Sequence, residues 1–526
     1  MRRGRRKFLR DVAALAAAAR VTVREASPRS SPARIVVDPK PLFDISPLLY
    51  MQFMEPLGTT DGSVEAAWDY GTEDWRKDLI DVVKDLAPDV VRYGGLFCRY
   101  YKWREGVGPA KSRPVMRNYV WGGIESNRVG TREFIDFCRR VGAEPLMCVN
   151  FLSDGDRTFW KTSDGQNRSG DAAEAADWVS YCNDPDNSER KAHGCPEPHT
   201  IKLWQLGNET SYGAGWFTKA ETIRHTIEFS KAMKQRDPTI QLIGWGDRGP
   251  KREDGYWAAD LIKQAGEHLD FVAMHMMGQT PPRPNSVLRG WKYQHEPEQA
   301  WDELLELAGR VDSRISEFEQ IVNSASPKIG IAVTEGHLSL RPYNANPILY
   351  EWLTGAYHAC SMNVYQRHGA RVKIATAADF FGTRWTVNAV MMPVPGGDSF
   401  LMPVGSVMRL FKRHNGKQGV AVRSAPSELD IAASCSGNRI YLHVANVSYN
   451  RSCEVSFAVD GMTLTGGRVL EIAPETPRAH VSELDRNVFT PVEKQLPPGP
   501  APTWRFPATS VSVVELEVKG QHPPGA

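Results

Sequence analysis

The strongest constraint on the fold is a regular alternation of short apolar runs with helical segments between about residues 46 and 385. There are eight apolar runs, at 48–54, 90–97, 145–151, 201–207, 241–245, 271–276, 328–334 and 371–380. They lack a clean alternation of polar and apolar residues, which is typical of parallel strands buried on both faces. Eight strand–helix units in succession predict a (β/α)8 barrel, a TIM barrel, with long loops after the strands.

The segments between the runs have the spacing of amphipathic helices. Within 131–141, apolar residues recur at intervals of three or four, and Thr131 is the expected N-cap. Further helices are predicted over 219–236 and 297–323. An open, doubly wound sheet is the alternative fold. No Gly-x-Gly-x-x-Gly motif follows the first run, which disfavours that alternative.

The pattern changes after about residue 386, where short segments alternate apolar and polar side chains. Predicted strands lie at 439–447, 455–459 and 511–518. Residues 386–526 are therefore predicted to form an antiparallel β-sandwich and tail. Residues 34–45 are expected to add an N-terminal strand to that sandwich, which leaves 46–385 as the catalytic barrel.

Residues 1–33 resemble an export signal followed by a spacer. Arg5-Arg6-Lys7-Phe8-Leu9-Arg10 resembles the twin-arginine signal, and a short apolar run follows at 12–19. That run is too short to span a bilayer. We therefore expect export to the periplasm or the cell exterior. A basic tail without a targeting role is the alternative.

Charge and cysteine spacing exclude several other classes of protein. The chain carries 64 Lys and Arg against 62 Asp and Glu, a formal net charge of +2. This balance gives no electrostatic argument for nucleic acid or an anionic membrane as a partner. None of the eight cysteines forms a Cys-x-x-Cys pair, so no metal or other cofactor is expected. A homo-oligomer is compatible with the sequence.

Two carboxylates follow directly after predicted barrel strands. Glu209 closes Leu206-Gly207-Asn208-Glu209, and Glu335 lies in Thr334-Glu335-Gly336. In barrel enzymes the chemistry sits at these carboxyl ends, and a buried charge is costly unless it is used or paired. Glycoside hydrolysis requires one protonated and one ionised carboxyl group facing each other, about 5 to 5.5 Å apart in retaining enzymes. The alternative is that each glutamate only closes an ion pair with a nearby arginine.

Further motifs make the chain resemble glycoside hydrolase family 51, a family of clan A whose best-known members are α-L-arabinofuranosidases. The resemblance extends from about residue 45 to residue 416. The matching stretches are Gln52-Phe53-Met54-Glu55, Arg92-Tyr93-Gly94-Gly95, Tyr101-Lys102-Trp103-Arg104-Glu105-Gly106-Val107-Gly108-Pro109, Glu125-Ser126-Asn127, Gly142-Ala143-Glu144-Pro145, Asp177-Trp178-Val179-Ser180-Tyr181-Cys182-Asn183 and Leu206-Gly207-Asn208-Glu209. The resemblance implies a barrel joined to a β-sandwich, as predicted above.

The resemblance also implies roles for the residues at the strand ends. Glu209 would be the general acid/base and Glu335 the nucleophile of a retaining mechanism. Asn208 would hydrogen-bond the sugar 2-hydroxyl, a contact that strengthens in an oxocarbenium-like transition state.

Three other residues would complete the site. Glu55 would bind sugar hydroxyls in the innermost subsite. Arg92 would keep Glu335 ionised, because an adjacent cation favours the charged form of a carboxylate. His275, at the end of the sixth strand, would lie beside the site. The alternatives are that Glu55 and Arg92 pair with each other, and that His275 is a satisfied core histidine.

Several positions depart from the family pattern. Leu96 stands where the family has Asn or Cys after its Arg-Tyr-Pro-Gly-Gly motif, and Met277 lies where aromatic residues follow the histidine. The usual Asp-Glu-Trp around the nucleophile is Thr334-Glu335-Gly336, and Asp379 stands near an expected Gln. The leading hypothesis is an exo-acting α-L-arabinofuranosidase acting on polysaccharide fragments, with another furanoside as a possible substrate. A β-glycanase of the endoglucanase kind and a non-catalytic carbohydrate-binding protein are the alternatives.

Overall fold

The computed structural model describes residues 33–213, 216–279 and 284–520. The predicted export signal, up to residue 32, lies outside the described residues. Among the helices that the structure describes, none is both long and apolar enough to cross a bilayer.

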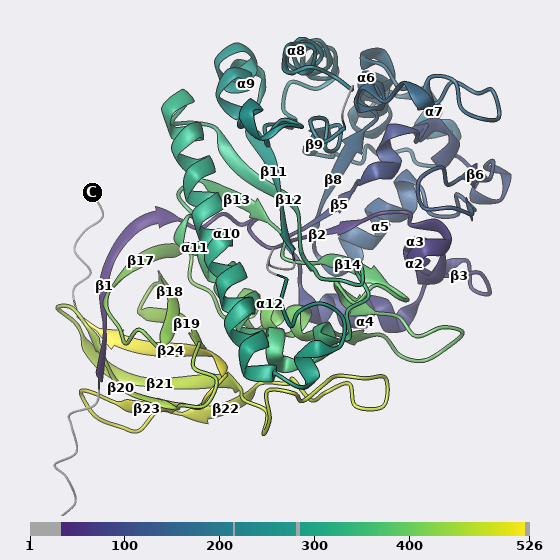
Figure 1. The fold of residues 1–526 in the computed structure, drawn as a ribbon. Helices are drawn as coiled ribbons and strands as arrows, with labels where there is room; N and C mark the ends of the chain where they lie inside the picture. The colour runs from purple at the N-terminus through teal and green to yellow at the C-terminus, as the bar shows by residue number, and fades with distance from the viewer. Residues whose placement is uncertain (1–32, 214–215, 280–283, 521–526) are drawn as a thin grey trace, which may run out of the picture.

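The centre of the molecule is an eight-stranded parallel sheet that curls into a barrel (Figure 1). Its strands, in spatial order, are β2 (Met51–Met54), β5 (Val90–Tyr93), β8 (Glu144–Val149), β9 (Leu203–Leu206), β10 (Gln241–Trp245), β11 (Phe271–Gln279), β12 (Gly330–Ser339) and β13 (Val372–Ala375). A parallel bridge between Tyr50 and Ala375 joins the first and last strands. The prediction of a (β/α)8 barrel is confirmed.

A helix follows each barrel strand and covers the outside of the barrel (Figure 1). These helices are α4 (Lys77–Leu86), α5 (Thr131–Val141), α6 (Ala172–Asn183), α8 (Lys219–Arg236), α9 (Ala258–Ala265), α10 (Pro297–Ala325), α11 (Gly355–Arg367) and α12 (Pro403–Arg413). Each short, buried strand is thus enclosed between the barrel interior and a helical layer, which explains its apolar composition.

Helix α5 begins differently from the prediction. Its apolar positions are buried as the spacing predicts, but the N-cap is Gly130, so the assignment of Thr131 as N-cap was wrong. The Glu133 carboxylate accepts from the Gly130 backbone N–H at 3.0 Å, and the Thr131 hydroxyl accepts from Trp178 Nε1–H at 3.1 Å. The Thr131 hydroxyl, which the sequence predicted to cap the helix, therefore bonds to Trp178 instead.

The eighth apolar run contains two separate strands. Only β13 joins the barrel, whereas β14 (Asp379–Gly382) begins a small sheet with β15 (Asn388–Met391) and β16 (Phe400–Leu401). Helix α12 comes after that sheet and packs against α4 and α11. A helix of the barrel layer thus lies beyond residue 385, where the sequence placed the end of the barrel.

The second domain is a nine-stranded sheet that curls around its own apolar core (Figure 1). Its strands, in spatial order, are β22 (Val492–Gln495), β21 (Thr463–Ile472), β24 (Val511–Lys519), β19 (Arg439–Asn446), β18 (Leu429–Ser436), β17 (Gln418–Ser424), β1 (Ala33–Asp44), β20 (Cys453–Val459) and β23 (Thr503–Phe506). The pairing of β1 with β20 is parallel, and the other pairings are antiparallel. The predicted sandwich domain is confirmed, and β1 is an internal strand of its sheet, between β17 and β20.

Two buried tryptophans connect the domains. Trp301 of α10 donates to the Val447 carbonyl at 2.8 Å, and Trp352, which precedes α11, donates to the Thr509 carbonyl at 2.9 Å. Each indole places its apolar body in the core and satisfies its N–H on the sandwich. The sandwich is thereby held against α10 and α11 on the side of the barrel.

Candidate active site

A pocket of about 240 Å³ lies at the carboxyl ends of the barrel strands. This is the face on which (β/α)8 enzymes hold their catalytic groups. Its lining residues are Phe53, Glu55, Leu96, Trp121, Glu209, Tyr212, Met277, Glu335, His337, Ser339, Tyr343, Asn344, Asp379 and Trp385. Both strand-end glutamates singled out in the sequence therefore open onto one cavity.

Glu209 is presented by a tight turn directly after β9. Its own φ is +57° and that of Gly207 is +70°, both in the left-handed region. A Cβ at Gly207 would lie 2.1 Å from Asp154 Oδ1, so the turn requires glycine there. Asp154 accepts from the Asn208 backbone N–H at 3.0 Å and pairs with Arg99 at 3.1 Å. The strained backbone of Glu209 is thus held in place by a buried ion pair beneath it.

Glu335 lies within β12 and pairs with the guanidinium of Arg92. The distance from Arg92 Nη1 to Glu335 Oε1 is 3.0 Å, and the Arg92 side chain is fully buried. Glu335 therefore does form the ion pair with an arginine that was the alternative for it, but the same carboxylate also faces the pocket. The guanidinium thus places a positive charge directly beside this carboxylate.

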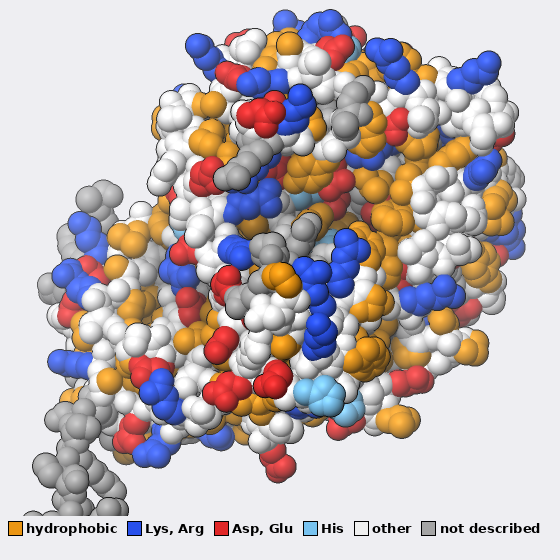
Figure 2. Space-filling view, viewed as in Figure 1, with side chains coloured by type: hydrophobic (Ala, Val, Ile, Leu, Met, Phe, Trp, Pro, Cys, Tyr) orange, Lys and Arg blue, Asp and Glu red, His pale blue; other side chains and the backbone are white. Residues whose placement is uncertain are grey.

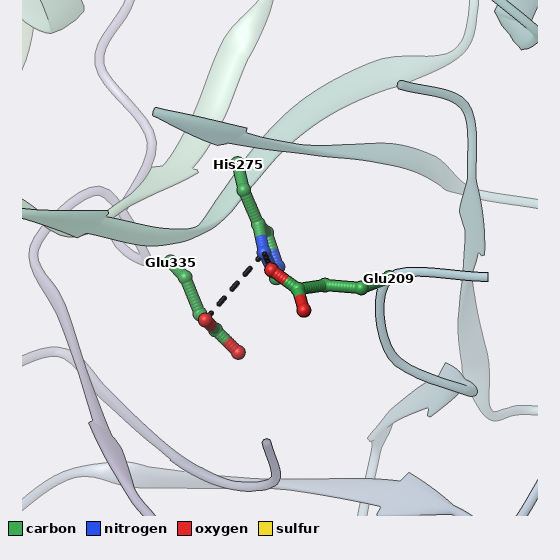
Figure 3. A group of neighbouring side chains, drawn as sticks. All are labelled: Glu209, His275 and Glu335. Atoms are coloured by element: carbon green, nitrogen blue, oxygen red, sulfur yellow. Dashed lines mark hydrogen bonds and ion pairs between the residues drawn. The ribbon is translucent and has the colours of Figure 1, made fainter. Parts of the chain in front are cut away.

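His275 lies between the two glutamates, whose side chains point toward it in Figure 3. Its Nδ1 is 3.0 Å from Glu209 Oε1 and 3.5 Å from Glu335 Oε2. One oxygen of each carboxylate and one ring nitrogen all lie within 4.8 Å of one another. This spacing matches the short carboxylate separation of retaining glycosidases rather than the roughly 6.5 to 9.5 Å of inverting ones.

Burial sets the protonation of this group. It raises the pKa of Glu209 above its ordinary value of 4.5, an effect that the nearby Arg99 and Arg92 oppose. Burial also lowers the pKa of His275 to about 4. At neutral pH the histidine is therefore uncharged, and it is in contact with the active-site carboxylates rather than being an isolated core residue.

Asn208 and Arg92 form a buried contact beside the carboxylates. Arg92 Nη2 donates to Asn208 Oδ1, which orients the amide with its Nδ2 on the other side. Within the described residues, Asn208 Nδ2 is buried and has no hydrogen-bond partner. A buried donor without a partner is costly. Asn208 is fully buried and is not among the residues that line the pocket, although it directly precedes Glu209, which is.

Glu55, which follows β2, also lines the pocket. It accepts from the Phe97 backbone N–H at 3.2 Å and from Trp121 Nε1–H at 2.9 Å. Arg92 forms its ion pair with Glu335 and not with Glu55, which was the alternative considered for these two residues. Burial and, second, the charge of Glu335 raise the pKa of Glu55 well above its ordinary value. A protonated Glu55 can both donate to and accept from a hydroxyl.

Sequence reasoning did not name His337, Trp121 or Trp385 as site residues, and it named Asp379 only as a departure from the family pattern. His337 and Asp379 form a pair in the pocket, with His337 Nδ1 2.8 Å from Asp379 Oδ1. Burial disfavours the imidazolium, but the charge and hydrogen bond of Asp379, together with the charges of Glu335 and Glu209, raise the pKa of His337. His337 could have been found, because it lies two residues after Glu335 on the same face of the strand. Trp121 and Trp385 come from long loops and carry no comparable signal.

The positions that depart from the family pattern do line the pocket. Leu96 and Met277 contribute apolar surface, and Asp379 contributes the carboxylate of the pair with His337. The pocket thus keeps Glu209 and Glu335, whereas part of its remaining lining differs from what the resemblance implies.

Glu209, His275 and Glu335 also have the atom types of metal ligands. The guanidinium of Arg92 already lies 3.0 Å from Glu335, and that of Arg99 lies 3.9 Å from Glu209. These cations neutralise the carboxylates and oppose a metal ion between them. The arrangement fits acid–base and nucleophilic chemistry better than metal binding.

On the face drawn in Figure 2, charged side chains of one sign do not dominate the surface around the barrel. Acidic and basic side chains are mixed across that face, in keeping with the formal net charge of +2. The electrostatics thus favour an uncharged polar ligand over a polyanion.

Comparisons with known proteins agree with this geometry. A family model described as the alpha-L-arabinofuranosidase 1 domain matches residues 82–298. An intracellular exo-alpha-(1->5)-L-arabinofuranosidase of Acetivibrio thermocellus is 34% identical over 255 residues, which are 46% of this chain and 48% of that protein. A second protein of this description, from Bacillus subtilis, is 28% identical over 401 residues, or 71% of this chain and 73% of that protein. The chain spans about half the length of the first curated relatives that it matches.

The solved structures extend the likeness to nearly the whole chain. The GH51 alpha-L-arabinofuranosidase from Thermotoga petrophila has a TM-score of 0.71 and 26% sequence identity, over 92% of this chain and 100% of that chain. The likeness includes both the barrel and the sandwich-like second domain.

Proposed function

We propose that this chain, which is glycoside hydrolase family 51-like in sequence and fold, is a retaining, exo-acting α-L-arabinofuranosidase. It would release single arabinofuranosyl residues from polysaccharide fragments. The observation that supports this most directly is the placing of one oxygen of Glu209 and one of Glu335 within 4.8 Å of each other at a barrel mouth. That spacing leaves room for an anomeric carbon between the carboxylates and for direct attack by one of them.

In the first step, the Glu335 carboxylate attacks the anomeric carbon and forms a glycosyl ester. The bond from that carbon to the leaving oxygen breaks, and the leaving oxygen takes the proton of Glu209. The raised pKa of Glu209 keeps this proton available to a higher pH than in an ordinary glutamate. Arg92, 3.0 Å from Glu335, would hold the attacking carboxylate in place.

In the second step, the Glu209 carboxylate takes a proton from water, and the water oxygen attacks the same carbon. The ester bond to Glu335 breaks, and the sugar leaves with its original configuration. The unpartnered Nδ2 of Asn208 would donate to the sugar 2-hydroxyl, and Glu55 would bind hydroxyls deeper in the pocket. Both contacts would strengthen as positive charge develops on the ring.

The shape of the site supports removal of single residues. Its volume of about 240 Å³ is below the roughly 300 Å³ at which sites for drug-sized ligands begin. Trp121, Tyr343 and Trp385 form aromatic walls around it. A pocket of this size suits one sugar ring, whereas a β-glycanase needs a cleft for a chain on both sides of the cleaved bond.

A substrate panel tests the proposal. We expect p-nitrophenyl α-L-arabinofuranoside to be hydrolysed at least about 100-fold faster than the matched arabinopyranoside, β-xyloside and β-glucoside. Each of these pyranosides would lose some of the contacts that the pocket makes with a furanose ring. With arabino-oligosaccharides, chromatography should show free arabinose as the first product. Internal fragments as first products, or a preference for β-glucosides, would favour the endoglucanase alternative.

The pH dependence should report Glu209. Because the acid form is the active one and burial raises its pKa, kcat/KM should stay high above the ordinary glutamate value of 4.5 and fall as the pH rises through the pKa of Glu209. A profile of kcat/KM against pH measures this basic limb. The limb should be absent from Glu209→Ala and retained in Glu317→Gln, a surface variant on α10. If the limb persists in Glu209→Ala, Glu209 is not the acid.

We also propose that residues 1–33 direct export by the twin-arginine route, on the ground of the Arg5-Arg6 motif. A fusion of this segment to a folded reporter should bring the reporter into the periplasm or medium. Changing Arg5 and Arg6 together to Lys should keep it in the cytoplasm, as measured by cell fractionation. Equal export of both fusions would contradict the proposal.

A further inference from the structure

A one-residue bulge in β12 brings two consecutive side chains to the same histidine. Met274 pairs with Val333 and His275 pairs with Glu335, so Thr334 is the extra residue of β12. In a regular strand, neighbouring side chains point to opposite faces of the sheet. Here Thr334 Oγ1 lies 3.1 Å from His275 Nε2, while Glu335 Oε2 lies 3.5 Å from His275 Nδ1. The bulge therefore aims both residues at the two ends of one imidazole ring.

The neutral ring must place its single proton on one of these two nitrogens. His275 Nδ1 faces two carboxyl groups, at 3.0 Å and 3.5 Å, and both offer acceptor oxygens. Nε2 faces only the Thr334 hydroxyl, which can donate as well as accept. With the proton on Nδ1 and Nε2 accepting from Thr334, the ring presents a donor to both carboxyl groups, whereas a bare Nδ1 would turn its lone pair toward the Glu335 oxygen.

We propose that Thr334 is a positioning residue for the acid/base, an inference that rests on the proposed function. Its hydroxyl donates to His275 Nε2 and so keeps the imidazole proton on Nδ1, where that proton is donated to Glu209 Oε1. Because Oε1 then acts as an acceptor, the acidic proton of Glu209 is carried by Oε2. The geometry thereby selects which oxygen of Glu209 delivers the proton to the leaving group.

The proton balance of the step is simple. The O–H bond at Glu209 Oε2 breaks, its electron pair stays on Oε2, and the proton goes to the leaving oxygen as that oxygen gains the electrons of the glycosidic bond. His275 keeps its Nδ1 proton throughout. The Nδ1–H bond to Glu209 becomes charge-assisted and stronger once the carboxylate is ionised. No charge passes to the histidine.

The hydroxyl at position 334 has a different capacity from a carboxylate. The family pattern of Asp-Glu-Trp would place an aspartate at the position of Thr334, and an ionised aspartate can only accept. An acceptor there would draw a proton onto Nε2, which leaves Nδ1 either unprotonated or part of an imidazolium. The threonine therefore suits a neutral His275 with Nδ1–H, whereas aspartate would change either its tautomer or its charge.

The direct test is the tautomer of His275 in three variants. Long-range ¹⁵N–¹H correlation spectra of full-length, ¹⁵N-histidine-labelled protein distinguish protonated from unprotonated ring nitrogens, and His275→Gln assigns the signal. We expect Nδ1–H in the wild type and in Thr334→Ser. Thr334→Asp should show a proton on Nε2, and Thr334→Val should lose the clear preference for Nδ1–H. A wild-type proton on Nε2, or an unchanged spectrum in Thr334→Val, would overturn the proposal.

Kinetics give a second readout that a purely structural role would not produce. Thr334→Val should lower kcat/KM by about 10-fold for a phenyl arabinofuranoside, the effect of one hydrogen bond, and by much less for a dinitrophenyl one that needs no acid. Thr334→Ser should restore most of the loss. Thr222→Val is the matched control, because this buried threonine of α8 has a hydroxyl with no hydrogen-bond partner in the structure. Equal losses on both substrates would contradict a role through Glu209.

The two proposals can fail separately. If the wild type hydrolyses no aryl furanoside, the proposed function is wrong, while the spectra still report the tautomer. If the wild type is active but its tautomer does not depend on residue 334, only the role of Thr334 is wrong.

Discussion

Replacing Glu335 by glutamine is expected to lower kcat on p-nitrophenyl α-L-arabinofuranoside by on the order of 10⁴-fold or more. Glutamine has the shape of glutamate but a neutral amide, which cannot form the glycosyl ester. The loss should be equally large for dinitrophenyl substrates, because a better leaving group does not replace the nucleophile. Initial rates and pre-steady-state measurements on both substrates test this expectation.

The matched control is Glu317→Gln, the same chemical change on the exposed face of α10, where Glu317 pairs with Arg248. This variant should keep wild-type rates. Glu335→Gln leaves the buried guanidinium of Arg92 without its charged partner, so its thermal transition should fall, and the rates are compared below that transition. A rate within about 10-fold of the wild type would show that Glu335 is not the nucleophile.

Removing the carboxyl group of Glu209 should have an effect that depends on the leaving group. For Glu209→Ala, kcat/KM should remain within about 10-fold of the wild type on dinitrophenyl arabinofuranoside but fall by about 10² to 10⁴-fold on natural oligosaccharides. A good leaving group departs without a proton, whereas a sugar alcohol requires one. Rates across a series of aryl leaving groups should therefore fall more steeply with leaving-group pKa than those of the wild type.

Azide separates the second step from the first. In Glu209→Ala the glycosyl ester accumulates, because no base activates water. Azide needs no base and fits the space left by the side chain, so it should raise kcat and yield an arabinosyl azide of retained configuration. The wild type should not respond. Product of inverted configuration, or no acceleration by azide, would contradict the retaining assignment of the two glutamates.

Together these variants distinguish the competing functions. A carbohydrate-binding protein without activity would show no turnover to lose. An inverting enzyme would form no covalent intermediate and no azide product of retained configuration. A retaining β-glycanase would show the same mutational pattern, and only the substrate panel separates it from an arabinofuranosidase.

The arrangement of the barrel and the position of both glutamates could be predicted from the sequence, because these features are encoded over short distances along the chain. The apolar spacing of α5 and of each strand depends on neighbours within a few residues. Glu209 follows β9, whereas Glu335, predicted to follow its strand, lies within the longer β12. Because the strands of a parallel barrel share one direction, both glutamates still reach the same face.

Other features depend on which residues the tertiary structure brings together. Strand β1 pairs in parallel with β20, and the Trp178 indole donates to the Thr131 hydroxyl. Both contacts join residues that are far apart in the chain. The pair of His337 and Asp379 joins the barrel strand β12 to β14 of the small sheet.

The bulge at Thr334 is the clearest case of this kind. Nothing in the local sequence distinguishes Thr334 from a regular strand residue, because a bulge is a property of the register between β12 and its neighbour β11. Local sequence therefore determined which carboxylates face the pocket. The pairing of strands across the barrel decided how those carboxylates, His275 and Thr334 are oriented, because hydrogen-bond register is set only when distant segments meet.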